Sequence, residues 1–332
     1  MLPSPPVFRA RPFDGARIAL VVLALVRCGA PDRYPVVSGP RDWAAHPAIV
    51  SREAPVDAPI YAVSDVHGGF ARLVALLSRH GVVAGTAADP AGLRWRGGAA
   101  VLVIAGDMID KGPSSLEVLE LARALGEDAR ASGGEVIALF GNHEAEFLQD
   151  PLNSKADADD GIDPELRAHR IDPMAIANGS DPRGRWLRER PFGARVGAWF
   201  FSHAGHTGGR SIAALEDALR TSVNAQDYTG AETVGDTSIV EARAWWLTTS
   251  AAASARALGV EHFVFGHTPA ALGARGAIAT AEQGRLFRID CGMSPGVNDS
   301  QGALLRVRLD GGREVAESLG PDGTVRLLWR AP

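Results

Sequence analysis

Five short segments of the sequence place oxygen or nitrogen ligands at the end of an apolar run, often beside glycine. The segments are 64–68 (SDVHG), 106–112 (GDMIDKG), 141–144 (GNHE), 202–205 (SHAG) and 266–269 (GHTP). They offer six metal-ligand side chains: Asp65, His67, Asp107, Asn142, His203 and His267. Carboxylate, amide and imidazole ligands without thiolate suit divalent ions, so we expect two ions, manganese first, with iron or zinc as alternatives. Two adjacent ions are typical of enzymes that displace groups at phosphorus.

The elements that must position these ligands follow from apolar patterning. Short apolar runs predict buried strands at 60–63, 99–105 and 135–140, and helical spacing of leucines predicts helices at 70–80 and 114–131. Alternation of strands and helices indicates a parallel sheet covered by helices. Functional residues collect beyond the carboxyl ends of such strands. The runs at 199–201 and 262–265 precede His203 and His267, so five strands should deliver the ligands to one rim.

The C-terminal part of the chain is richer in strands. Apolar or alternating runs occur at 285–289, 303–309, 314–318 and 324–329. The glycines at 311–312 and the Asp-Gly pair at 322–323 are hairpin-turn candidates. We therefore expect these strands to form a second sheet packed against the first.

Composition divides the 332-residue chain into segments. Residues 1–30 combine arginines with an apolar run at 18–26, which is too short to span a bilayer but resembles a secretory signal. We therefore expect export, to the periplasm or to a membrane anchor, with a cytoplasmic location as the alternative. Lipidation at Cys28 is disfavoured by the neighbouring Arg27. Residues 31–58 are proline-rich and predict a linker or arm, and 59–330 should form one domain.

Three further features limit the expected fold and function. Residues 150–193 are polar and too long for an ordinary connection, so we interpret them as an insertion that forms a small cap. The net charge of -5 gives no reason to expect nucleic acid as a partner. Cys28 and Cys291, the two cysteines, form neither a disulfide framework nor a zinc-thiolate site.

The five motifs in this order resemble the phosphoprotein phosphatase family of calcineurin-like metallophosphoesterases, over about residues 60–310. The segment 289–294 (IDCGMS) and the glycine pair at 133–134 are most similar to its Shewanella-like branch. The resemblance implies an α/β fold with two packed mixed β-sheets flanked by helices. It also implies that Asp65, His67 and Asp107 hold one metal, and that Asp107, Asn142, His203 and His267 hold the other.

The same resemblance gives roles to residues beside the ligands. His143 would be the general acid and Asp110 would orient it, while a hydroxide formed between the metals attacks phosphorus in line. This family usually has arginine where Lys111 stands, and lysine binds phosphate as a point charge without the bidentate geometry. Phosphate would also contact Asn142, and the sequence leaves three arginines open as compensation for Lys111: Arg188, Arg190 and Arg243.

The function expected from this resemblance is hydrolysis of phosphomonoesters in phosphoproteins, phosphotyrosine in first place. A small phosphoester substrate is compatible with the same site. One alternative is a symmetrical diadenosine polyphosphate hydrolase, although Glu144 after Asn142 and His143 favours the phosphatase pattern. An alternative of another class is an inactive protein that only binds phosphorylated ligands. Lys111 is the departure that invites it, and the complete ligand set argues against it.

Overall fold

The computed structural model describes residues 41–295, 297 and 300–332. The expected signal segment 1–30, Cys28 and the first part of the expected arm lie outside the described residues. Within the described ranges, no helix is both long and apolar enough to cross a membrane.

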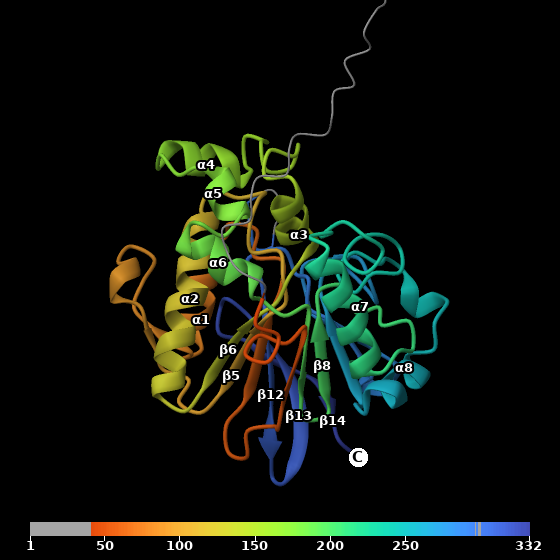
Figure 1. The fold of residues 1–332 in the computed structure, drawn as a ribbon. Coiled ribbons are helices and arrows are strands. Elements are labelled where there is room, and N and C mark those ends of the chain that lie inside the picture. Colours follow the sequence, from red (N-terminus) through yellow and green to blue (C-terminus); the bar gives the residue numbers. More distant parts are fainter. Residues whose placement is uncertain (1–40, 296, 298–299) are drawn as a thin grey trace, which may run out of the picture. The chain divides into compact units, whose positions relative to one another are not determined.

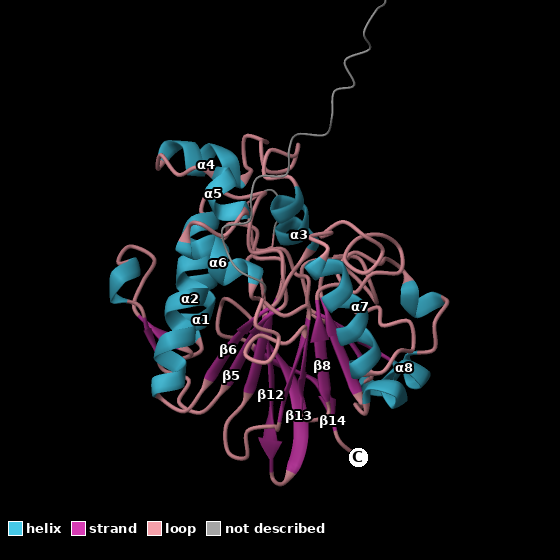
Figure 2. Cartoon of the chain, in the orientation of Figure 1, coloured by secondary structure: helices cyan, strands magenta, loops and turns pink. Residues whose placement is uncertain are grey.

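Two six-stranded sheets form the centre of the domain (Figures 1 and 2). The first sheet has the order β14 (Val325–Arg330), β13 (Arg313–Leu319), β12 (Leu304–Asp310), β2 (Ile60–Val63), β5 (Val101–Ile104) and β6 (Glu135–Ala138). The second has the order β1 (Ile49–Arg52), β7 (Gly193–Val196), β8 (Trp199–Ser202), β9 (His262–Phe265), β11 (Leu286–Arg288) and β10 (Ala279–Ala281). Both sheets mix parallel and antiparallel pairs, as the family resemblance implies, whereas the alternation of strands and helices predicted a parallel sheet.

Alternate residues of each strand face different layers. In β2, Ile60 and Ala62 belong to the apolar cluster between the sheets, whereas Tyr61 and Val63 pack toward the helices. The second sheet supplies Trp199 and Phe201 to the same inter-sheet cluster. Because successive side chains of a strand point to opposite faces, central strands such as β2, β5 and β8 are buried on both faces and read as continuous apolar runs, whereas β14 at the edge of the first sheet is largely exposed.

The helices cover the outer faces of the sheets. In Figure 1, α1 (Phe70–Arg79) and α2 (Ser115–Ala131) lie outside the first sheet, and α7 (Ile212–Asn224) and α8 (Ala251–Leu258) lie outside the second. The expected helices at 70–80 and 114–131 therefore form with nearly the expected bounds. Smaller regular pieces include the ribbon of β3 (Val83–Ala84) and β4 (Arg94–Trp95), and three short 3-10 turns at Pro90–Gly92, Trp245–Leu247 and Glu282–Gly284.

The expected assignment of the C-terminal strands to a second sheet holds for the run at 285–289, which forms β11, and is wrong for the other three runs. The two hairpin turns form, but β12 pairs antiparallel with β2 and so extends the first sheet. The free edge of β2 accepts this partner because β5 occupies only its other edge. The second sheet is instead completed by β11, which pairs in parallel with β9, and by β1.

β1 also shifts the start of the folded part. The sequence predicts a domain that begins near residue 59, yet Ile49–Arg52 pairs in parallel with β7. Ile49 and Val50 are buried, so this part of the expected linker contributes to the core.

The segment 150–193 contains three short helices, α4 (Ile162–Ala168), α5 (Pro173–Ala177) and α6 (Pro182–Arg188). Two of them begin with Asp-Pro: Asp172 and Asp181 accept the N–H groups of Met174 and Arg183. Proline at the first helical position fits this start because its missing N–H would have no partner there. α4 and α6 contact α2, and α5 contacts α3 (Asn142–Gln149).

Candidate metal centre

The six predicted metal ligands follow strands of both sheets. Asp65 and His67 come after β2, Asp107 after β5 and Asn142 after β6, whereas His203 and His267 come after β8 and β9. All six side chains are buried, with exposed fractions of 6% or less. The carboxyl ends of strands from both sheets therefore meet at one place, beyond the single-sheet rim that the sequence indicated.

Asp107 lies at the centre of this cluster. Its Oδ2 is 3.4 Å from His67 Nε2, and its Oδ1 is 3.2 Å from His203 Nε2. Potential ligand atoms of His67, Asp107 and His143 lie within 4.8 Å of one another, and so do those of Asp107, His203 and His267. The two carboxylate oxygens thus face different groups of ligands, which is the geometry needed to bridge two cations.

Asp65 and Asn142 are held in place by neighbouring residues. Asp65 Oδ2 accepts a hydrogen bond from Ser64 Oγ at 2.6 Å, and the N–H of His267 lies 3.1 Å from the same oxygen. Asn142 Nδ2 donates to Glu146 Oε1 at 3.0 Å, so the opposite atom of the amide, Oδ1, is the one turned away from Glu146. Lys155 from the 150–193 segment holds Glu146 at 2.6 Å.

Several buried ligand atoms have no hydrogen-bond partner among the described residues. Asn142 Oδ1 and His267 Nε2 are two of them. Buried polar atoms normally find a partner, and an exception calls for an ion or another bound group. In His67 and His203 the Nδ1 atom faces a backbone carbonyl, of Ile109 and Ala105, and the Nε2 atom lies on the side of Asp107, where it could bind a cation. The donor set therefore fits divalent cations.

The electrostatics of the cluster agree with this fit. Burial lowers the pKa of His67 to about 3 and that of His267 to about 2, which leaves both rings neutral. Although burial opposes it, the charge of Asp107 raises the pKa of His203 to about 10. Burial raises the pKa of Asp65, and burial together with Asp65 raises the pKa of Asp290. Divalent cations would relieve the repulsion among these carboxylates and compete with protons for the imidazoles.

His143 and Asp110 form a pair beside the cluster. His143 Nδ1 lies 2.7 Å from Asp110 Oδ2, and His143 Nε2 lies 4.0 Å from Asp107 Oδ2. Asp110 Oδ1 accepts the N–H of Ile162 at 2.9 Å, and the N–H of Asp110 donates to Ser115 Oγ at 3.1 Å. Asp110 is thus fixed from three sides, and the free nitrogen of His143 faces the predicted ligands.

The loops that carry these side chains have an unusual backbone. In these loops, six of the non-glycine residues with positive φ have values between 47 and 61: Asp65, His67, Asp107, Asp110, Lys111 and His267. Left-handed backbone is uncommon for such residues and persists where the surroundings impose it. Glu144 supplies part of that constraint, because its fully buried carboxylate accepts the N–H groups of Asp107, Met108, Ile109 and Gly141.

The sequence did not indicate that Glu144 braces the Asp107 loop or that Asp290 lies near Asp65. For Glu144 a local signal was available, because the capping-box position three residues into α3 indicates an inward carboxylate. Asp290 follows β11, in the same position relative to a strand as the metal ligands, and that position was the available signal.

The four positively charged side chains that the sequence offers for binding phosphate lie at different distances from the predicted metal ligands. Lys111 Nζ lies 3.2 Å from His67 Nε2, and Arg243 Nη1 donates to the carbonyl of His267 at 3.3 Å. Arg188 instead donates to the carbonyl of Ala177, and Arg190 to that of Trp186. The structure therefore brings Lys111 and Arg243 to the ligands and ties Arg188 and Arg190 to the 150–193 segment.

Comparison with known families assigns the chain to a class. The family model described as calcineurin-like phosphoesterase matches residues 58–271, so the chain belongs to this family. With the fold and the His/Asp cluster described above, this identifies a metal-dependent phosphoester hydrolase and confirms the family expected from the motifs.

Solved structures with a similar fold include two phosphatases. The cold-active protein-tyrosine phosphatase of a psychrophilic Shewanella species has a TM-score of 0.67 and 22% identity, over 85% of this chain and 82% of that one. A protein serine/threonine phosphatase from Saccharomyces cerevisiae has a TM-score of 0.53 and 15% identity, over 84% and 85% of the two chains. At these identities the likeness shows the fold alone.

Curated relatives match shorter stretches. An uncharacterized protein of Schizosaccharomyces pombe is 35% identical over 98 residues, which are 30% of this chain and 26% of the relative. A symmetrical bis(5'-nucleosyl)-tetraphosphatase of Cronobacter sakazakii is 30% identical over 131 residues, 40% of this chain and 36% of the relative. The matched stretch thus spans about a third or less of each relative.

Proposed function

We propose that this chain is a two-metal phosphomonoesterase that acts on phosphoproteins, with phosphotyrosine as the preferred residue. One observation carries the proposal: Asp107 turns its two oxygens toward two ligand groups, and the His143–Asp110 pair lies directly beside them. A bridging carboxylate with an adjacent, oriented imidazole provides both electrostatic stabilisation and a proton for the leaving group.

In this proposal the buried residues of the site hold the cations or keep the ligands in place. Asp65, His67 and Asp107 would hold one cation, and Asp107, Asn142, His203 and His267 the other. Bound together, the cations lower the pKa of coordinated water and neutralise charge on the phosphoryl oxygens. Glu144 keeps the Asp107 loop in place, and Glu146 keeps Asn142 Oδ1 pointed at the ligands.

His143 acts at the leaving group. With Nδ1 held by Asp110, only Nε2 is available to give a proton to the departing alkoxide or phenolate, and Nε2 is the atom on the side of Asp107. Lys111 and Arg243 supply positive charge for the phosphate oxygens. We also propose that the 150–193 segment flanks the substrate entrance, because Ile162 binds Asp110 and Asp160 accepts the N–H of Gly112.

The competing substrate class is a symmetrical dinucleoside polyphosphate, supported by the local identity to the Cronobacter sakazakii tetraphosphatase. The test is kcat/KM of the manganese-loaded protein on a phosphotyrosyl peptide, the matched phosphoseryl peptide and diadenosine tetraphosphate. The proposal predicts the highest value for phosphotyrosine. A higher kcat/KM for diadenosine tetraphosphate would contradict the proposal and favour a dinucleoside polyphosphate hydrolase. If none of the three substrates were hydrolysed, the result would support an inactive binding protein.

A further inference from the structure

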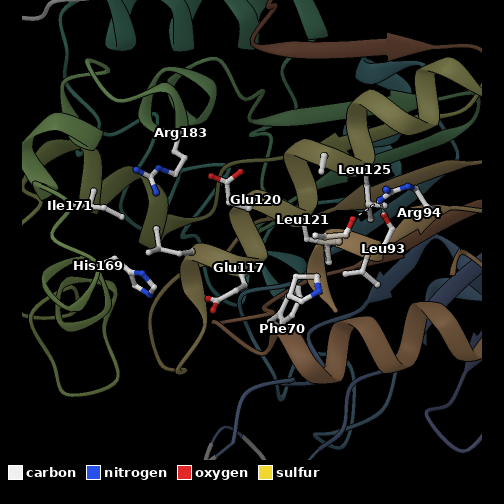
Figure 3. Close-up of a pocket in the computed structure, with 14 residues that line it drawn as sticks. Phe70, Leu93, Arg94, Glu117, Glu120, Leu121, Leu125, His169, Ile171 and Arg183 are labelled. Atoms are coloured by element: carbon white, nitrogen blue, oxygen red, sulfur yellow. Dashed lines mark hydrogen bonds between the residues drawn. The ribbon is translucent and has the colours of Figure 1, made fainter. Parts of the chain in front are cut away.

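The 150–193 segment contacts the domain on two sides that differ in chemistry. Toward α2 it borders a cavity of about 420 Å³ whose lining is mostly apolar. Figure 3 shows Ile171 and Arg183 of the segment on one side of this cavity and Leu121 of α2 on the other. Arg183 is paired with Asp181 of the same segment at 2.6 Å, so its charge is neutralised within the segment.

The side toward α3 is polar and leads to a predicted metal ligand. Lys155 Nζ donates to Glu146 Oε1 at 2.6 Å, and Asn142 Nδ2 donates to the same oxygen at 3.0 Å. Glu146 follows Asn142 by one turn of α3, so the two side chains lie on the same face of the helix. Two consecutive hydrogen bonds thus join the 150–193 segment to Asn142.

These bonds fix which atom of the Asn142 amide faces the other ligands. A carboxylate accepts hydrogen bonds and donates none, so Glu146 can bind the NH2 group of Asn142 but not its oxygen. Asn142 Oδ1 is buried and has no hydrogen-bond partner among the described residues. Since the oxygen is the amide atom that can bind a cation, anchoring Nδ2 holds Asn142 in the orientation of a metal ligand.

The loop that carries Lys155 is held by hydrogen bonds of its own. Asn153 Oδ1 accepts the N–H groups of Lys155 and Ala156, at 2.9 and 3.2 Å. Asn153 Nδ2 in turn donates to the carbonyl of Asp150. Ala156, the next residue, is buried in the core. The backbone of Lys155 is therefore fixed, although 40% of its side chain is exposed.

We propose that Lys155 is a positioning residue of the metal centre: it holds Glu146 against Asn142 and so strengthens binding of the cation assigned to Asn142. This inference rests on the proposed function, which gives Asn142 to one of two bound cations. Residues that orient a metal ligand through a hydrogen bond typically change metal affinity about 10–100-fold when they are replaced. The 150–193 segment would then help to build the metal site in addition to flanking the substrate entrance.

The test is titration of the metal-free full chain with Mn²⁺, followed by calorimetry, which needs no turnover. The wild type should bind two ions. Lys155→Met should weaken one of them roughly tenfold and leave the other unchanged, and Lys155→Arg should restore the affinity because it keeps a charged donor. Arg123→Met is the matched control, since Arg123 is also 40% exposed and pairs at 2.7 Å with Glu120, which lies beside the cavity of Figure 3.

A double-mutant cycle tests whether Lys155 acts through Glu146. Glu146→Gln should weaken the same ion about 10–100-fold, because glutamine can donate as well as accept and no longer fixes the amide of Asn142. Adding Lys155→Met to Glu146→Gln should then cause no further loss. Unchanged melting temperatures of the metal-free proteins establish that the variants fold.

The outcomes separate the role of Lys155 from the proposed function. If the wild type binds two ions and Lys155→Met binds both as tightly, the role of Lys155 is contradicted while the two-metal proposal stands. A loss that adds fully to that of Glu146→Gln, or an equal loss in Arg123→Met, would contradict this role as well. A wild type that binds fewer than two ions would overturn both proposals.

Discussion

His143 Nδ1 lies 2.7 Å from Asp110 Oδ2, and each of the two side chains is only 2% exposed. The second oxygen of Asp110 accepts the N–H of Ile162, so the same carboxylate joins the histidine to the 150–193 segment. One oxygen of Asp110 binds His143 Nδ1 and the other binds the N–H of Ile162, so the imidazole is held with its Nε2 atom on the side of Asp107. This arrangement explains how a helix outside the sheets contributes to the geometry of the candidate active site.

Replacing His143 by asparagine should remove proton donation to the leaving group. We expect kcat to fall roughly 10²–10⁴-fold on phenyl phosphate, the typical contribution of a general acid. The fall should be smaller on 4-nitrophenyl phosphate, whose leaving group needs no proton, and the bound metal content should not change. Equal losses on both substrates, or wild-type turnover on either, would exclude His143 as the acid.

The Asp110→Asn variant tests whether both oxygens of Asp110 are needed, one for His143 and one for Ile162. An amide offers one oxygen in place of two, so either the bond to His143 or the bond to Ile162 is lost, and a buried N–H without a partner costs about 1–3 kcal/mol. We expect both kcat and the free energy of unfolding to fall. Asp160→Asn is the control, because Asp160 contacts Gly112 through its backbone carbonyl alone. An unchanged kcat in Asp110→Asn would show that His143 needs no such support.

Lys111 and Arg243 should matter for substrate affinity, whereas Arg188 should not. Loss of one charge-assisted contact to phosphate is expected to raise KM for aryl phosphates about tenfold or more in Lys111→Ala and in Arg243→Ala. Lys111→Arg should retain a KM near that of the wild type, since the charge remains. Arg188→Ala is the comparison, because its guanidinium binds the carbonyl of Ala177 and lies 5.6 Å from the ring of Tyr228. A larger effect of Arg188→Ala than of Lys111→Ala would reverse this ranking.

The contact between α2 and α4 should make stability depend on pH. Burial, with the neighbouring Glu117, raises the pKa of Glu165 to about 8, above that of an unfolded glutamate. Glu165 therefore holds its proton in the folded chain but not in the unfolded chain between about pH 4.5 and pH 8, so the stability that this residue contributes falls as pH rises through this window. We expect a smaller slope of melting temperature against pH in Glu165→Gln than in the wild type or in the control Glu120→Gln. Identical slopes in all three proteins would contradict the assignment.

The sequence was informative where chemistry and patterning coincide. Each of the six ligands stands shortly after an apolar run, so the strands β2, β5, β6, β8 and β9 could be predicted together with the residues that follow them, whereas the division of these strands between two sheets could not. The helices α1 and α2 could be predicted from the spacing of their leucines, because apolar residues at helical spacing indicate a helix that is buried on one face.

Features that depend on distant parts of the chain were not predictable in this way. The pairing of β12 with β2 joins strands far apart in sequence, and β1 is too short and too close to prolines to show a period. The capping-box position of Glu144 indicates its bond to Gly141, but its bonds to the N–H groups of Asp107, Met108 and Ile109 join residues more than 30 positions apart and depend on the fold. The choice among Arg188, Arg190 and Arg243 likewise required the folded positions of their guanidinium groups.

The central claim, a pair of metal ions bridged by Asp107, is tested most directly by anomalous diffraction from crystals of the wild-type protein grown with Mn²⁺. The account predicts two anomalous peaks about 3.5–4 Å apart, one on each side of the Asp107 carboxylate. One peak should have Asp65 and His67 as neighbours, and the other should have Asn142, His203 and His267. A single peak, or two peaks that do not share Asp107, would contradict it.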